Sequence, residues 1–195
     1  MKSVLISIQP RWCELIASGK KTVEVRKTKP KLDVPFKCYI YCTKDNTFAE
    51  KTLRGFDNNG KAIYYKANKG KVIGEFVCDR IDYIGWISNP TKLDWKNYYD
   101  KNSCLTSSQL YDYSNGDCYY EWHISDLVIY DKPRELGEFY QIGKNNDRFY
   151  YDYCAGCPNH ETPVGEYPCN ECDGNRNYLY RPPQSWCYVE SEDTE

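Results

Sequence analysis

The chain lacks any long apolar run, and this absence excludes one class of protein. No stretch of its 195 residues approaches the ~20 apolar residues that a membrane-spanning helix needs. The first twelve residues, MKSVLISIQPRW, also lack the extended apolar segment of a secretory signal. We therefore expect a cytoplasmic protein with no membrane partner.

The cysteines cannot all be joined in disulfide bonds within the chain. The chain has 11 of them, an odd number, which argues against a disulfide framework and for a reducing compartment. Seven are scattered singly, and we interpret these as small hydrophobic side chains of the core. They are Cys13, Cys38, Cys42, Cys78, Cys104, Cys118 and Cys187.

A strong excess of positive charge is also missing, since the formal net charge is −2. This argues against a large nonspecific nucleic-acid footprint. The charge is uneven, however, because residues 1–44 hold ten Lys or Arg against three Asp or Glu, a net of +7. A compact basic run between Lys20 and Lys37 fits either a local anion-binding mouth or a solvated edge strand guarded by lysines.

Four further cysteines near the C-terminus have the spacing of a metal site. They form two Cys-x-x-Cys knuckles separated by eleven residues, at Cys154, Cys157, Cys169 and Cys172. Two tight turns can direct four thiolates at one ion, and tetrahedral thiolate sites typically hold structural zinc. We predict zinc as the cofactor; paired disulfides, or His160 as a substitute ligand, are the alternatives.

Local patterns indicate many short strands and two short helices. Pro10 can open a helix over 10–18 that Gly19 ends, and Thr106 with Gln109 forms a capping box for a helix that Asn115 and Gly116 close. Alternation, aromatic runs and turn residues predict the strands. They are 4–8, 22–26, 37–43, 53–56, 62–65, 70–84, 119–130 and 184–190.

These elements indicate an α+β protein with a mixed or antiparallel, barrel-like sheet. The economical domain count is one main domain with an elaboration. We expect the barrel to comprise residues 1–150 and 181–195. Residues 151–180 would form a zinc-knuckle insertion before the last strand.

Several segments together resemble the ASCH domains of the PUA-like superfamily. They are Ile8-Gln9-Pro10-Arg11-Trp12, Lys21-Thr22-Val23-Glu24-Val25-Arg26, Gly70 to Phe76, Trp122 to Leu127, and Arg181 to Val189. The segments resemble the small ASCH proteins that are common in bacterial and phage genomes. The resemblance implies a small β-barrel with short flanking helices. It also implies a cleft between the first helix and the barrel that binds RNA or a modified nucleoside.

The residue types in this region suit such a ligand. The Gln9 amide can donate and accept at a nucleobase edge, and Trp12 can stack on a base. Lys21, Glu24 and Arg26 would supply a carboxylate for exocyclic amines and cations for oxygens. The predicted ligand-binding residues are Gln9, Trp12, Lys21, Glu24, Arg26, Glu75, His123, Gln184 and Trp186.

Simpler interpretations of the same residues remain open. Trp12 and Trp186 can be core side chains, and Glu24 with Arg26 can be an exposed cross-strand pair. His123, one of only two histidines, is more typical of a satisfied core group than of an acid or base.

A hydrolase on the same cleft is the alternative function, either a ribonuclease or a nucleoside amidohydrolase. A PUA-like amidohydrolase of 4-acetylcytidine uses a lysine and, three residues later, a threonine. Here Lys21 is followed by Glu24, and 104–109 contains no carboxylate that could be the acidic partner. A neighbouring carboxylate favours the charged form of a lysine, which suits neither a base nor a nucleophile. We therefore assign no catalytic residue.

A zinc-dependent protein-interaction adaptor is the third hypothesis. Residues 154–176 contain one base, Arg176, against four acids. Zinc-bound thiolates add negative charge, so the knuckle suits a protein partner better than a phosphate backbone.

Overall fold

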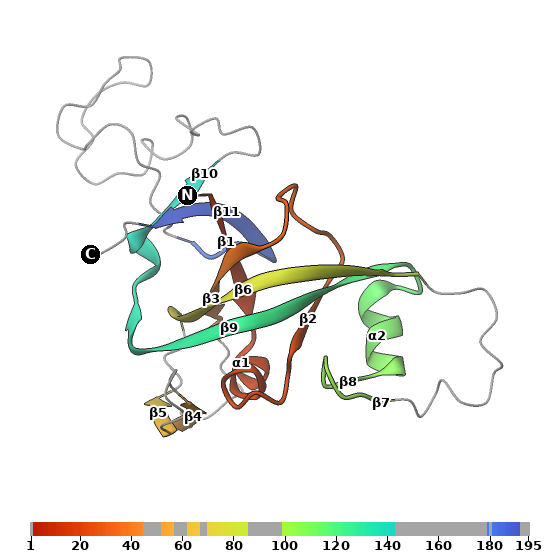
Figure 1. Ribbon diagram of the computed structural model, residues 1–195, viewed down its shortest axis with the longest axis horizontal. Coiled ribbons are helices and arrows are strands. Elements are labelled where there is room, and N and C mark those ends of the chain that lie inside the picture. Colours follow the sequence, from red (N-terminus) through yellow and green to blue (C-terminus); the bar gives the residue numbers. More distant parts are fainter. Residues whose placement is uncertain are drawn as a thin grey trace, which may run out of the picture.

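A seven-stranded mixed sheet organises the chain (Figure 1). The computed structural model describes residues 2–44, 52–56, 62–66, 70–85, 99–142, 179 and 181–191. The order of strands in the sheet is β10-β11-β1-β3-β6-β9-β2. Their bounds are β1 Ser3–Ile8, β2 Val23–Arg26, β3 Phe36–Cys42, β6 Lys71–Ile84, β9 Tyr119–Arg134, β10 Phe139–Ile142 and β11 Trp186–Ser191.

Two small hairpins and two short helices accompany this sheet. β4 pairs with β5, and β7 pairs with β8. Helix α1 follows β1 directly, and α2 follows β8. The bounds are α1 Pro10–Ala17, β4 Thr52–Phe56, β5 Ala62–Lys66, β7 Tyr99–Asp100, β8 Leu105–Thr106 and α2 Ser107–Ser114, with a 3₁₀ turn at Leu136–Glu138.

The closed barrel predicted from the sequence is wrong for the described residues. The sheet has β10 at one edge and β2 at the other, and no ladder among the described strands joins these two edges. The mixed character was predicted correctly: β1 runs parallel to β3, and the other strand pairs of this sheet are antiparallel. Parallel neighbours need a crossover, and the segment that carries α1 and β2 provides it.

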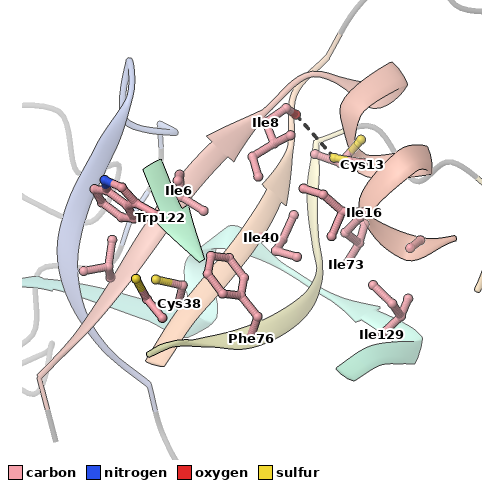
Figure 2. Close-up of a cluster of buried hydrophobic side chains, with 14 of the residues drawn as sticks. Ile6, Ile8, Cys13, Ile16, Cys38, Ile40, Ile73, Phe76, Trp122 and Ile129 are labelled. Carbon is pink, nitrogen blue, oxygen red and sulfur yellow. Dashed lines mark hydrogen bonds between the residues drawn. The ribbon is translucent and has the colours of Figure 1, made fainter. Parts of the chain in front are cut away.

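The principal core lies between α1 and one face of the sheet (Figure 2). Cys13 and Ile16 of α1 pack there with Ile8, Ile40 and Ile73, all almost fully buried. The Cys13 thiol donates to the carbonyl of Ile8 at 3.5 Å, which ties the helix to the end of β1. Because α1 is anchored in this way, its N-terminal end has a fixed position beside the sheet.

The helix signals in the sequence were sufficient for both helices. Pro10 is the first residue of α1. Thr106 and Gln109 form the predicted capping box of α2, and Asn115 ends that helix in the left-handed region with φ 58°. Local side-chain chemistry therefore determines where these helices begin and end.

Gly74 lies where β6 and β9 approach closely. A Cβ at this position would stand 2.3 Å from the carbonyl oxygen of Val128, so no larger residue fits without a shift of the backbone. The register of β6 against β9 is irregular between Val72 and Gly74. The long strand predicted over 70–84 is therefore interrupted by a bulge that orients the residues after it.

Three strand predictions need correction. β9 extends beyond the predicted range 119–130 and ends at Arg134. β10 and the short pair β7 and β8 were not predicted.

The zinc knuckle with its four cysteines and His160 lies outside the described residues. Neither helix of the described segments is long and apolar enough to cross a membrane.

Candidate functional site

Three charged side chains are buried together at the start of β2. The exposed fractions of Lys21, Glu24 and Arg26 are 3%, 6% and 7%. Lys21 Nζ lies 3.3 Å from Glu24 Oε2, and Arg26 Nη2 lies 3.0 Å from Glu24 Oε1. The exposed cross-strand pair considered for Glu24 and Arg26 is therefore wrong. We call these three residues the charge cluster; it carries a net charge of +1.

Backbone and side-chain acceptors from distant segments complete the charge cluster. Lys21 Nζ donates to the carbonyl of Ser103 at 2.8 Å. Arg26 Nη2 donates to the carbonyl of Ser7 at 2.7 Å, and Nη1 donates to Ser185 Oγ at 3.2 Å. Sequence reasoning missed all three serines, because single serines 82, 19 and 159 residues away carry no local signal.

Some polar atoms of this region remain unsatisfied. Glu24 Oε2, Arg26 Nε and Ser103 Oγ are buried without a hydrogen-bond partner in the described part of the chain. Glu24 Oε2 is close to Lys21, but the geometry there is that of an ion pair only. Buried polar groups are normally hydrogen-bonded, so leaving these three atoms unpaired costs stability.

Trp12 lies beside the charge cluster near the N-terminal end of α1, and Gln9 precedes it by one helical turn. The Trp12 ring is half-buried; Lys21 Nζ is 5.3 Å and the Arg11 guanidinium 4.3 Å from its centre. Gln9 is exposed at the N-cap position of α1, where its side chain makes no capping hydrogen bond. An indole face among cations thus lies one helical turn from an exposed amide.

Gln184 and Trp186 approach the same region from the C-terminal segment. Trp186 packs against Trp122, with ring centres 5.9 Å apart, and its Nε1 donates to Thr28 Oγ1 at 3.1 Å. Gln184 is exposed and precedes Ser185, which accepts from Arg26. Trp186 is therefore partly a core side chain, while Gln184 is open to solvent.

Glu75 lies on the opposite face of the sheet. It is paired with Tyr39, which belongs to a second core cluster away from α1. Glu75 contacts Lys37 Nζ at 3.0 Å and accepts from the Tyr130 hydroxyl at 2.5 Å. Burial, together with this hydrogen bond, raises the pKa of Tyr130. The structure thus does not bring Glu75 together with the charge cluster.

His123 is also separated from the charge cluster, because successive residues of β9 point to opposite faces and Trp122 occupies the face of Glu24. His123 Nε2 lies 2.8 Å from Asp82 Oδ2 and 2.9 Å from Arg80 Nη2. It is a half-buried member of an ion-pair network and not the core group we considered.

Asp82, Glu121 and His123 form a group with ligand atoms within 4.8 Å of one another. One imidazole and two carboxylates can hold a divalent ion. The sequence alone does not reveal this group, because the three residues meet only through the register of β6 against β9. The Arg80 guanidinium already contacts Asp82 at 3.1 Å and His123, so two members of the group have partners within the protein.

The environment of Glu121 indicates that the stability of the fold depends on pH. Burial raises the pKa of Glu121, and the charge of Asp100 raises it further. The folded protein therefore holds this proton to a higher pH than the unfolded chain, and stability falls as pH rises through that window. We expect Glu121→Gln to raise the urea midpoint at pH 7 more than at pH 4. Glu190→Gln, at an exposed carboxylate on β11, is the control, and equal shifts at both pH values would contradict the assignment.

The comparisons with known proteins agree with this fold. The family model of the ASCH domain matches residues 6–135, and the chain therefore belongs to the ASCH domain family. These domains are PUA-like and generally bind RNA.

Three of the similar solved structures are ASCH proteins from Zymomonas mobilis. The unmutated protein has 23% identity, covers 69% of this chain and 73% of its own, and gives a TM-score of 0.45. Two mutants of it give 22% and 23% identity, cover 70% and 69% of this chain and 77% and 74% of their own, and have TM-scores of 0.46 and 0.44. No curated protein matches the chain.

Proposed function

We propose that this chain binds RNA, or a modified nucleotide within RNA, at the surface formed by the N-terminal end of α1 and by β2. The observation that carries the proposal is the position of the charge cluster beside Trp12, one helical turn after the exposed Gln9. A stacking face, an amide and fixed cations are the groups that recognise an unstacked nucleotide. The family's general RNA binding supports the same conclusion.

The two kinds of polar group would have different roles. Gln9 is exposed, so its amide can reach a base edge without displacing another contact. The charge cluster is almost fully buried, so it would hold the surface in shape and contribute a positive potential rather than wrap around a ligand. Exposed Arg11 and Lys20 would add cations for phosphate oxygens at the rim.

The hydrolase alternative receives less support from this geometry. Lys21 Nζ contacts only acceptors among its described partners, the Ser103 carbonyl and the Glu24 carboxylate. A lysine held in this way is a positioned cation, whereas a nucleophile or base needs access to its substrate. Gln184 is a further predicted ligand-binding residue that is exposed, next to Ser185 of the Arg26 hydrogen bond.

Gln9→Ala tests the proposal. It is expected to weaken the binding of short single-stranded RNA by about 1–3 kcal/mol, the usual cost of leaving a buried polar contact of the complex unpaired. Trp12→Ala should weaken it by a similar amount through lost stacking, about 1–3 kcal/mol per base. The measurement is calorimetric titration. Gln141→Ala, at a half-buried amide on β10, should leave the affinity unchanged.

Two outcomes would contradict this function. Unaltered affinity in both variants would remove this surface as the binding site. RNA cleaved, or 4-acetylcytidine deacetylated, at a rate lost in Lys21→Ala would establish the hydrolase instead; a binding protein returns its ligand intact.

A further inference from the structure

A row of side chains leads from the charge cluster to the outer end of the β6 and β9 pair. Arg26 of β2 is directly opposite Tyr120 of β9, and Tyr120 is directly opposite Tyr83 of β6. Directly paired residues of antiparallel strands lie on the same face of a sheet. The row therefore begins at the charge cluster and continues across three neighbouring strands.

Tyr83 is the accessible tyrosine of this row, and Tyr120 beside it is half-buried. Tyr83 is 63% exposed, the largest value among the described large hydrophobic side chains. Its ring contacts that of Tyr120 edge to face, with centres 5.5 Å apart and planes at 62°. A hydrophobic ring that stays this exposed next to a second ring offers its face to a planar partner.

Two lysines after β2 lie over tyrosines on the two sides of this edge strand, because α2 packs against the face that carries Val25 and Tyr119. Lys27 Nζ is 5.4 Å from the ring centre of Tyr113 on α2, and Lys29 Nζ is 5.8 Å from that of Tyr120. Both lysines are exposed, and Tyr113 is 37% exposed. We call Lys27, Lys29, Tyr83, Tyr113 and Tyr120 the tyrosine–lysine surface.

The neighbouring charges favour an anionic partner. Glu24 is neutralised by Lys21 and Arg26, so Lys27 and Lys29 set the potential next to the charge cluster. A hydrogen bond with Cys118 raises the pKa of Tyr83, and the negative charge of Asp117, at the outer end of the row, raises it further. Phosphates would therefore follow the lysines on the β2 side, and bases would reach toward Tyr83.

We propose that the tyrosine–lysine surface binds a single-stranded RNA segment that continues from the nucleotide at Gln9 and Trp12. This inference rests on the proposed function and extends it, because it adds a second surface that binds the nucleotides next to the one at Gln9 and Trp12. Aromatic faces interleaved with cations are typical of proteins that bind single strands, in which bases stack and phosphates pair with Lys or Arg. Three neighbouring strands span roughly 10 Å, the length of about three stacked nucleotides.

The test compares ligand lengths. Fluorescence anisotropy measures the affinity for a mononucleotide and for labelled oligouridylates of two to eight nucleotides at several salt concentrations. Affinity should rise at least about tenfold between one and four nucleotides, and then level off, because each stacked base adds a favourable contact. For Lys27→Ala/Lys29→Ala, the slope of log affinity against log salt should become shallower by about 1.4, at roughly 0.7 per phosphate contact of a single strand.

Point variants separate stacking from charge. Tyr83→Ala should weaken tetranucleotide binding about 5- to 100-fold more than mononucleotide binding, the range expected for one stacked base, whereas Tyr83→Trp should retain it. Tyr111→Ala is the matched control, because Tyr111 is 45% exposed and lies two residues from Tyr113, on another side of α2. Melting curves of each variant verify that the fold is intact.

The outcomes distinguish this inference from the proposed function. Mononucleotide binding that depends on Gln9, with no increase for longer RNA, would overturn the inference and leave the function standing. Absence of binding to every RNA would overturn both. Equal loss in Tyr83→Ala and Tyr111→Ala would also overturn the inference, as would a protein that competes for this surface while RNA does not.

Discussion

Glu24→Ala is expected to lower the free energy of unfolding by about 3–5 kcal/mol, the usual cost of removing one partner from a buried ion pair. Glu24 is the only acid that contacts Lys21 and Arg26 among the described residues. Its removal leaves two cations almost fully buried without a counter-charge. Urea denaturation at neutral pH, with the slope checked for two-state behaviour, measures the effect.

Lys71→Ala provides the matched control. Lys71 also contacts a carboxylate, that of Glu135, but both side chains are substantially exposed, 38% and 65%. Exposed pairs contribute about 0–1 kcal/mol, so the loss in this variant should stay within that range. Equal effects of the two substitutions would show that the charge cluster is not buried in solution.

A triple replacement of the charge cluster would separate stability from function. Replacing Lys21, Glu24 and Arg26 together by apolar residues of similar size removes the desolvation cost along with the ion pairs, and such replacements are often neutral or stabilising. We therefore expect a smaller loss of stability than in Glu24→Ala. Under the proposed function, the triple variant should still bind RNA less well, since the positive potential beside Trp12 is gone.

Sequence reasoning succeeded where the determinants are local. Pro10 at the start of α1, the Thr106 capping box and Asn115 at the end of α2 each act within a few residues, so their effect can be predicted without the fold. The alternation over β2 likewise placed Glu24 and Arg26 on one face. What it could not provide was the burial of that face, because the covering acceptors belong to distant segments.

Sheet register accounts for the errors. Glu75 follows the bulge at Gly74, and its pairing with Tyr39 directs it to the face opposite the charge cluster. His123 and Glu24 lie on adjacent strands, but a shift of one residue separates them. The prediction of a closed sheet was also wrong. One edge of the observed sheet is β10, and the sequence of β10 carries no clear strand signal.

The second large effect concerns the four cysteines of the predicted zinc knuckle, which lie outside the described residues. We predict one zinc per chain bound by Cys154, Cys157, Cys169 and Cys172, and Cys157→Ser should reduce the metal content to near zero. Structural zinc in small peptides is bound with an apparent free energy of about 10–16 kcal/mol. Loss of one thiolate ligand should therefore remove most of the stabilisation that we expect zinc to give residues 151–180. Elemental analysis of the purified protein measures the stoichiometry.

The sheet itself should stay folded in Cys157→Ser, because the charge cluster and the α1 core draw on residues outside the knuckle. Cys118→Ser is the matched control: this half-buried cysteine should not affect the zinc content. A mercurial reagent should release the zinc of the wild type as it reacts with the four ligand thiols. Other cysteines should compete slowly for the reagent, because burial raises the pKa of Cys38 and brings that of Cys187 to about 12. A protein purified without zinc, or complete unfolding of Cys157→Ser, would show that residues 151–180 are not a metal-stabilised insertion.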